Sequence, residues 1–413
     1  MNPLPAAGKR MRLKIANARG APTIGITLLL ASLSMISPLS IDTFLPSLPT
    51  IADHFGLTRF QVQQIITAYL LPFACFSLVH GPLSDALGRR RVVLGGLVLY
   101  TLGSIGCFLA PTFGTLLLCR VLQGTAAGIG PTVSRAVVRD MFEGPGAQRL
   151  MSSIMLVFSL APAVAPVIGG WVHVTLGWRW VFGMLVVLGA ALLITCALLL
   201  PETHPRSRRT QFHALLLVKS CWRVAAQPAF LLLAISAALA MSSLFVYIGS
   251  APAIILEHWH LKETQFHYLF IPVVSGFMVA SLVGGRIAGR VSRMAQIRAG
   301  FALLCLAGVV GTVAYLFRAA LPIVFTQSLL FLMASGAQLT YPVLTLEMID
   351  MYPQARGAAA SVQTFIALGV GGLAMGLLAP TLHGDLRLLG WLALATGVAA
   401  WLAWRSGRAR KTA

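Results

Sequence analysis

Two charged side chains stand deep inside the apolar stretches of this sequence and could carry chemistry. Asp42 lies about eight residues, or roughly 12 Å, from the outer end of the first stretch, and Arg120 lies about seven residues, or roughly 10 Å, from the outer end of the fourth. A charge at the centre of a bilayer costs at least about 2.5 kcal/mol, so both side chains should face a bundle interior or water. The matching depths predict a protonatable acid beside a fixed cation, lining a cavity. A purely structural ion pair is the alternative.

Other polar and aromatic side chains could complete a pocket around this pair. Gln123 lies one turn from Arg120 and shares its helix face. Four further candidates lie in the second, seventh and tenth stretches: Tyr69, Tyr247, Gln338 and Tyr341. Such groups suit a permissive pocket for amphiphilic molecules, although each alone could serve packing.

A short basic turn follows the second stretch, with the sequence Gly81-Pro-Leu-Ser-Asp85-Ala-Leu-Gly88-Arg89-Arg90-Arg91. Gly81 and Gly88 would allow close helix approach and a sharp reversal, and the arginines mark a cytoplasmic side. A carboxylate at a helix end can pair with a cation or a helix N-terminus. We expect Arg139 as the partner of Asp85, with Arg89 as an equal alternative, and we predict that Asp85 holds an inner gate.

The fifth stretch contains two prolines four residues apart, Pro162 and Pro166, followed by Gly169 and Gly170. Proline frees backbone carbonyls and bends a helix, and the small residues around it give a smooth face. The pattern predicts a bent helix in close contact with a neighbour.

The elements that position these residues follow from the composition. The chain has 413 residues, of which 57% are hydrophobic and 10% charged, and its mean hydropathy is +0.84. Soluble domains carry about 25% charged residues. We therefore predict an all-α membrane protein. At roughly 20 apolar residues per span, this length holds about twelve helices.

Hydropathy places six spans on either side of a basic interval. The spans lie near 24–49, 61–83, 92–110, 113–137, 150–173, 178–200, 229–250, 266–288, 298–318, 321–346, 357–381 and 386–405. The expected units are a leader (1–22), two bundles (23–200 and 228–405), a linker between them (201–227) and a tail (406–413). The turn motif returns weakly about 204 positions later with Gly289 in place of Asp85, so the gate is expected on the first half alone.

The net charge of +20 is distributed unevenly. Segments on one side of the expected membrane hold 24 of the 31 lysines and arginines, and those on the other side hold five. This asymmetry places both termini in the cytoplasm and argues against nucleic acid as a partner. The six cysteines form no C-x-x-C pair, and the histidines at 258, 260 and 267 lack a ligand pattern. We expect no metal, no cofactor and no ATP-binding loop.

Several motifs resemble those of one transporter family. The turn resembles the loop between helices 2 and 3 of the major facilitator superfamily, and Arg120-Val-Leu-Gln123-Gly124 resembles its helix 4 signature R-x-x-Q-G. The helix 5 segment resembles the G-P-x-x-G-G pattern of drug/proton antiporters, with Ala165 replacing the first glycine. With 40–49, 177–182 and 201–203, these motifs resemble the bicyclomycin- and chloramphenicol-resistance (Bcr/CflA-type) branch.

The resemblance implies a twelve-helix exporter in the bacterial inner membrane, working as a monomer on small molecules and protons. It implies multidrug efflux by alternating access, with Asp42 as the proton-coupling acid. A transporter of a specific metabolite is the alternative within transport. A membrane-embedded enzyme would need catalytic groups at one depth, and only the set of Asp42, Arg120 and Gln123 qualifies.

Overall fold

The computed structural model describes residues 24–317, 321–382 and 386–412, which are almost entirely helical. Twelve segments of this described part are long and apolar enough to cross a bilayer, as the composition predicts. The expected leader at 1–22 lies outside the described residues, and so does Arg318, one of the five basic residues expected on the side opposite the termini.

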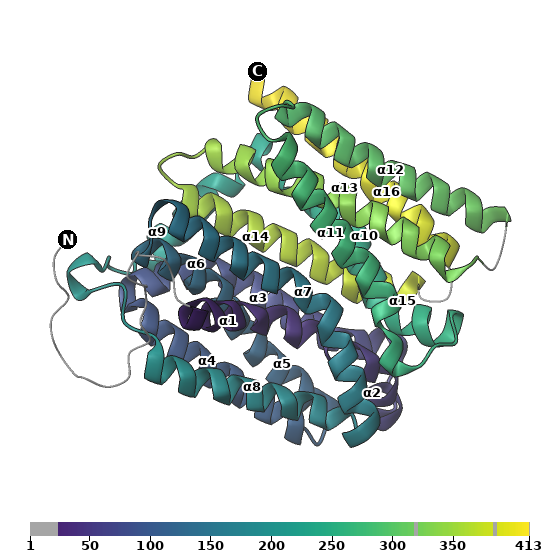
Figure 1. Cartoon of the computed structure of the whole chain (residues 1–413), viewed down its shortest axis with the longest axis horizontal. Coiled ribbons are helices and arrows are strands. Elements are labelled where there is room, and N and C mark those ends of the chain that lie inside the picture. Colours follow the sequence, from purple (N-terminus) through teal and green to yellow (C-terminus); the bar gives the residue numbers. More distant parts are fainter. Residues whose placement is uncertain (1–23, 318–320, 383–385, 413) are drawn as a thin grey trace.

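The first six spans form one half of the bundle, drawn from purple to teal in the lower part of Figure 1. Its elements are α1 (Ile24–Asp42), η1 (Leu45–Ser47), α2 (Leu48–Phe55), α3 (Arg59–Leu87), α4 (Arg89–Leu109), α5 (Phe113–Ala127), α6 (Ile129–Met141), α7 (Gly144–Leu176) and α8 (Trp178–Leu199). The first span comprises α1, η1 and α2, and the fourth comprises α5 and α6.

The last six spans form the other half, drawn in green and yellow above it (Figure 1). Its elements are α10 (Pro228–Gly249), η3 (Ala253–His258), η4 (Glu263–Gln265), α11 (His267–Ile287), α12 (Arg293–Phe317), α13 (Ile323–Asp350), α14 (Arg356–Leu373), η5 (Ala374–Leu378), α15 (Ala379–Leu382) and α16 (Leu386–Thr412). The connecting segment contains η2 (Arg206–Arg208) and a helix that we did not expect, α9 (Ala214–Ala225).

Polar residues at element boundaries set where the spans begin and reverse. Thr58 and Thr112 accept backbone N–H groups at the starts of α3 and α5, which satisfies donors that have no partner within the helix. Gly88 and Gly177 have φ values of +100° and +89°, which glycine adopts without strain. Each is the single residue between two long helices, so α3 and α4, and α7 and α8, are antiparallel neighbours.

The turn after the second span is shorter than the sequence suggests. The helix α3 continues through Gly81 and Asp85 to Leu87, and only Gly88 interrupts it. A Cβ atom on Gly81 would meet no heavy atom within 4 Å, so this glycine is not required by a close helix approach. Our interpretation of Gly81 as part of a glycine-flanked loop was therefore wrong, whereas Gly88 makes the reversal.

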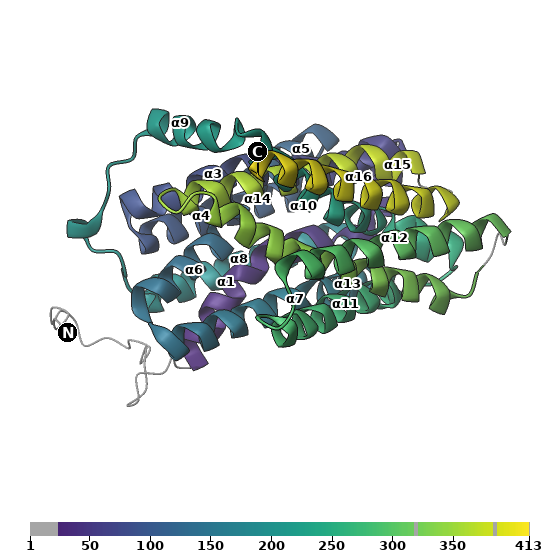
Figure 2. The same cartoon turned by 90° about the horizontal axis from the view of Figure 1, so that it is seen from above.

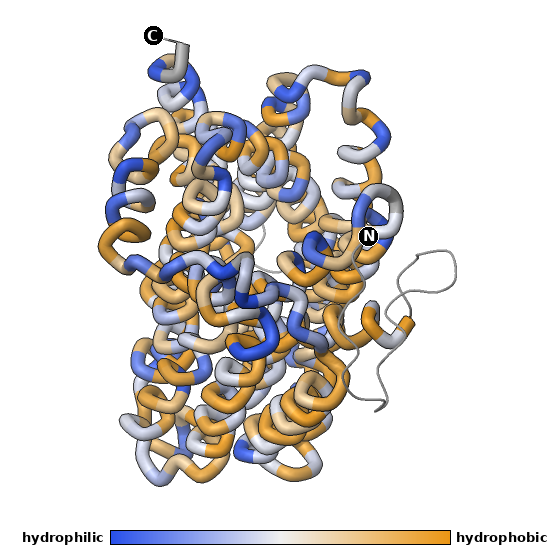
Figure 3. The backbone as a smooth tube through the Cα atoms, turned by 90° about the vertical axis from the view of Figure 1, so that its left-hand side faces the viewer, coloured by the Kyte–Doolittle hydropathy of each residue, from blue (hydrophilic) through white to orange (hydrophobic). Residues whose placement is uncertain are grey.

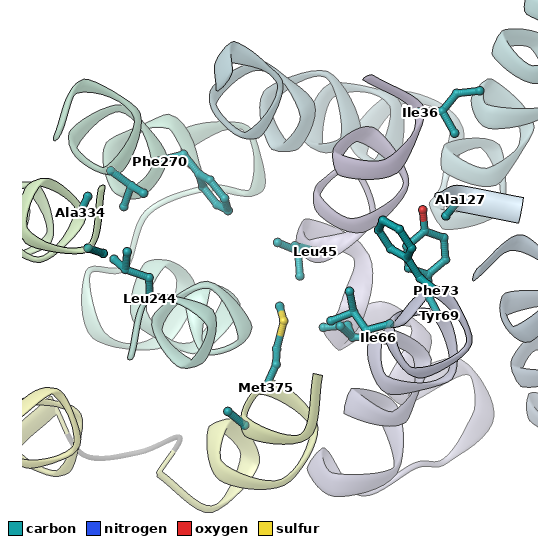
Figure 4. Close-up of a cluster of buried hydrophobic side chains, with 14 of the residues drawn as sticks. Ile36, Leu45, Ile66, Tyr69, Phe73, Ala127, Leu244, Phe270, Ala334 and Met375 are labelled. Atoms are coloured by element: carbon teal, nitrogen blue, oxygen red, sulfur yellow. The ribbon is translucent and has the colours of Figure 1, made fainter. Parts of the chain in front are cut away.

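Polar groups join the two halves at the end of the bundle opposite the linker, which we call the far end. Gln63 donates to the carbonyl of Gly249 at 3.3 Å, and Gln64 donates to the carbonyl of Gly376 at 3.1 Å. Arg59 forms an ion pair with Glu257 at 3.4 Å. Beside them, Met375 points toward Leu45 and Ile66 of the first half (Figure 4). Packing between the halves therefore closes the far end.

One face of α7 shows how the packing between the halves changes along the bundle. We call the end where residues 200–213 lie the linker end. Near the far end Gly170 and Pro166 are buried, and a Cβ atom on Gly170 would lie 2.1 Å from the carbonyl oxygen of Glu263. On the same face toward the linker end, Leu156 is 51% exposed and Ser152 is exposed. The face that contacts the second half at the far end is thus uncovered at the linker end. Figure 3, seen from that end, shows hydrophilic segments in front of the largely hydrophobic helices.

Gly169 should tolerate no side chain. A Cβ atom there would lie 1.7 Å from the carbonyl oxygen of Thr43, and backbone atoms cannot move aside easily. We expect Gly169→Ala to lower the unfolding free energy by about 1–3 kcal/mol, the usual range for overpacking, measured as a lower melting temperature in detergent. Gly95→Ala is the matched control, because nothing lies within 4 Å of a Cβ atom at that helical position. Equal melting temperatures for the two variants would contradict this packing.

Candidate functional site

Arg120 lies at the centre of a cluster built by the first half. Its side chain is fully buried in α5. Its Nε donates to the carbonyl of Ile65 in α3 at 3.2 Å, and Nη1 donates to the carbonyl of Ser40 in α1 at 3.1 Å. Gly124 allows this approach, because a Cβ atom there would lie 2.2 Å from the carbonyl oxygen of Tyr69. Close packing of α5 against α3 therefore brings the guanidinium within reach of main-chain oxygens.

Two aromatic rings flank the guanidinium of Arg120. Its central carbon lies 4.5 Å from the centroid of Phe44 and 4.4 Å from that of Tyr69, both within cation–π range. The hydroxyl of Tyr69 donates to the carbonyl of Ser37 at 3.3 Å, which holds its ring in place. Nη2 of Arg120 is buried and has no hydrogen-bond partner among the described residues. One donor group of the cation is therefore unused.

Gln123 is the polar side chain that the sequence placed beside Arg120, and it lies there. Its Oε1 accepts from Nη1 of Arg120 at 2.9 Å, and its Nε2 donates to Oγ of Ser104 in α4 at 2.7 Å. Cys107 Sγ also donates to the amide oxygen, at 3.6 Å. Gln123 thus ties the Arg120 cluster to α4.

Asp42 is the last residue of α1 and is only 5% exposed. Pro46 ends the helix here, because its nitrogen has no hydrogen to donate to the carbonyl of Asp42 four residues earlier. The described residues provide neither an ion pair nor a hydrogen bond for the Asp42 carboxylate. Asp42 and Arg120 both belong to this corner of the first half, yet the direct ion pair that we considered is not present.

The helix 5 residues set the surroundings of Asp42. Gly169 lies against the carbonyl of Thr43, the residue after Asp42, and Gly170 lies against the carbonyl of Glu263 from the second half. The helix α7 runs unbroken from Gly144 to Leu176 through Pro162 and Pro166. This helix therefore packs between the end of α1 and the second half at the far end.

The candidate residues of the second half do not join the Arg120 cluster. Tyr247 is 2% exposed and belongs to the hydrophobic core. Gln338 donates to the hydroxyl of Ser281 at 3.0 Å, on the neighbouring helix α11. Tyr341 is half-buried in α13 of the second half.

Arg89, not Arg139, is the partner of Asp85. Nη1 of Arg89 lies 2.5 Å from Asp85 Oδ1, and its Nε lies 3.0 Å from Asp140 Oδ2. Our preference for Arg139 was wrong, because Arg139 is exposed and its neighbour Asp140 takes the position facing α4. Arg90 points elsewhere and donates to the carbonyl of Ala197 in α8 at 2.6 Å.

Glu202, a residue of the motif at 201–203, completes this turn. Its Oε1 accepts the backbone N–H of Arg89 at 2.9 Å, so the carboxylate caps the N-terminus of α4. Its Oε2 lies 3.6 Å from Arg209 Nη2. The beginning of the linker is thereby fixed to the turn of the first half.

The second half carries a related but simpler arrangement. Arg293 begins α12 as Arg89 begins α4, and it pairs with Asp350 at 2.9 Å as Arg89 pairs with Asp140. Gly289 has φ of +78° and stands in a turn of several residues where no acid corresponds to Asp85. No group of three or more potential metal ligands occurs among the described residues.

Comparison with known proteins gives three findings. The profile of the Major Facilitator Superfamily matches residues 30–376. The bicyclomycin resistance protein homolog of Haemophilus influenzae is 27% identical over 68% of this chain and 71% of its own length, and the chloramphenicol resistance protein of Pseudomonas aeruginosa is 30% identical over 67% and 65%. A bacterial homolog of the human lysosomal transporter Spinster, solved in an inward-facing and unoccupied conformation, has a TM-score of 0.63 at 17% identity, covering 94% of this chain and 95% of that one.

The turn cluster gives a test that separates the two arginines. Asp140→Asn removes a charged acceptor from Arg89, whose side chain is 8% exposed, and should lower the unfolding free energy by roughly 1–3 kcal/mol. Arg139→Gln changes an exposed residue and should alter the unfolding free energy by less than about 1 kcal/mol. Thermal unfolding in detergent measures both. A larger loss for Arg139→Gln would restore Arg139 as the structural partner.

Proposed function

As a member of the Major Facilitator Superfamily, this chain is a multi-pass membrane transporter, and we propose that it exports small amphiphilic molecules, drugs among them, in exchange for protons. The resistance proteins to which it is similar support the substrate class. The observation that carries proton coupling is Asp42, an acid buried at membrane depth, for which the described residues provide neither a cation nor a hydrogen-bond donor.

The sidedness of the proposed exporter rests on charge. The linker end carries most of the basic residues, including the turn at Arg89–Arg91 and the turn around Arg290 and Arg293. Basic residues are retained on the cytoplasmic side of membranes, so the linker end is assigned to the cytoplasm of a bacterial cell and the far end to the outside. Both termini then lie in the cytoplasm.

Asp42 couples protons to transport because its charge is costly where it lies. A charged carboxylate at this depth is disfavoured by at least about 2.5 kcal/mol, and protonation removes that cost. A proton taken from the outside neutralises Asp42 and favours the conformation in which it is buried, with the far end closed. Loss of the proton to the cytoplasm makes the buried position unfavourable and drives the halves back. A conformational equilibrium moves only by such a difference between states.

Arg120 supplies a fixed positive charge in the same half of the protein as this acid. Its partners are neutral oxygens and aromatic faces, so no carboxylate cancels the charge. The unused Nη2 donor is available to a substrate oxygen or to Asp42 in another conformation. The uncovered face of α7 toward the linker end supports substrate entry from the cytoplasm. Gln338 and Tyr341 are proposed to line that route. The protein is proposed to work as a monomer.

Asp42→Asn tests the proton site. Asparagine keeps the shape and cannot change charge, so we expect efflux driven by an imposed proton gradient to fall by at least about tenfold, while exchange of labelled for unlabelled substrate without a gradient continues. The assay uses purified protein in liposomes and a panel of antibiotics. Asp53→Asn is the control, because Asp53 is an exposed acid of the same span. Gradient-driven efflux at the wild-type rate in Asp42→Asn would refute the assignment.

Arg120→Lys tests the fixed cation. Lysine keeps the charge but cannot donate to Ile65, Ser40 and Gln123 together or stack between two rings. We expect the variant to reach the membrane and to lose most efflux, with a lower melting temperature from the lost hydrogen bonds. Arg90→Lys is the control, since Arg90 donates a hydrogen bond to the carbonyl of Ala197 near the end of α8. If Arg120→Lys transports as well as Arg90→Lys, the planar guanidinium is not needed.

A further inference from the structure

The linker helix α9 (Ala214–Ala225) presents large apolar side chains to its surroundings. Leu215, Leu216, Val218 and Trp222 are 86%, 63%, 65% and 73% exposed. The opposite side of the helix is packed, with Val224 1% exposed. Figure 2 shows α9 on the outside of the bundle, and it contacts α3 of the first half and α14 of the second. Such a contiguous apolar face marks a surface that something apolar covers.

The covering partner must also be acidic. Lys219 and Arg223 are exposed on the same helix, between the apolar residues. Residues 203–227 contain five lysines and arginines and neither aspartate nor glutamate. A short helix that combines aliphatic side chains, a tryptophan and cations has the composition of segments that bind the headgroup boundary of anionic membranes.

A hollow lies beside this helix and extends the surface. It measures about 510 Å³ and lies between the end of α3 and the segment that leads into α9. Leu87 and Phe212 supply apolar walls, and Arg209, Gln211 and His213 supply polar ones. Nε of Arg209 is buried and has no hydrogen-bond partner among the described residues, although Nη2 pairs with Glu202. The hollow therefore has a cationic side chain in its wall next to apolar surface.

We propose that α9 and this hollow bind an anionic phospholipid from the leaflet at the linker end. The acyl chains cover Leu215, Leu216 and Trp222, and the headgroup phosphate lies among Lys219, Arg223 and Arg209. The same helix touches both halves, so the lipid occupies a position where they meet. This site is distinct from the Arg120 cluster, and its tests use no transport assay.

The first test compares lipid affinity. We expect Lys219→Gln/Arg223→Gln to weaken phosphatidylglycerol binding about 25-fold, because each cation near an anionic lipid surface contributes about fivefold. Phosphatidylcholine binding should stay unchanged. Native mass spectrometry of the purified full chain, titrated with each lipid in detergent, measures the ratio. Arg290→Gln/Arg298→Gln is the control, because it removes the same charge from exposed positions at or near the start of α12. No loss in the first variant, or an equal loss in both, overturns the proposal.

The second test asks what covers the apolar face. In liposomes of phosphatidylcholine and phosphatidylglycerol with brominated acyl chains, wild-type tryptophan emission should contain a quenched component that Trp222→Phe lacks. Light scattering of the purified protein in detergent reports its molecular mass. An unquenched Trp222 would mean that water or another protein lies against α9. A mass of two chains that falls to one in Trp222→Phe would mean that a second copy lies there. Either result would overturn the lipid site.

Discussion

A guanidinium buried at membrane depth without a carboxylate beside it constrains the first half of this protein. Removing one partner of a buried charge costs several kcal/mol, so the N–H groups of Arg120 must keep their oxygen acceptors. Two of these acceptors are main-chain carbonyls, at Ser40 and Ile65, and therefore depend on helix position rather than on side-chain identity. Satisfying Arg120 requires α1, α3 and α5 to hold fixed relative positions. The first half is for this reason expected to move as one rigid body.

The same constraint determines where Asp42 lies. The carbonyl of Ser40 accepts a hydrogen bond from Arg120, and Pro46 ends the helix a few residues later. Asp42 therefore lies at the last residue of α1, just after the part that Arg120 holds in place. Gly169 packs on the next residue, and Gly170 packs on the second half. Asp42 is thus linked, through Thr43 and α7, to the place where α7 meets the other half. The acid is positioned to influence the contact between halves without being part of it.

The fold could be predicted from the sequence, and the partners within the site only in part. Hydropathy and charge spacing indicate the twelve spans because burial in lipid imposes length and composition on every helix. Gln123 beside Arg120 follows from helix periodicity. The sequence could not predict that Asp42 and Arg120 do not pair. Arg120 instead donates to main-chain carbonyls of other helices, and these carry no sequence signal. Asp85 has Arg89 as its partner rather than Arg139 because α3 extends to Gly88, and helix ends are the least predictable boundaries. The helix α9 escaped prediction because its apolar run is too short to span.

Both halves have an arginine–aspartate pair at a turn, but the pair is buried only in the first half. The linker is attached to this buried turn. Arg89 and Asp140 are largely buried, whereas the corresponding Arg293 and Asp350 are more than half exposed, so the second pair contributes little. Glu202 fixes the start of the linker to the buried turn through the N–H of Arg89. The helix α9 at the other end of the linker packs mainly on α14 of the second half. Any movement of one half relative to the other would therefore be absorbed between Arg209 and Ala214, the segment that borders the hollow beside α3. The linker is thus fixed at both ends, to the turn of the first half and to α14. A change of conformation would alter the shape of the segment between these two points.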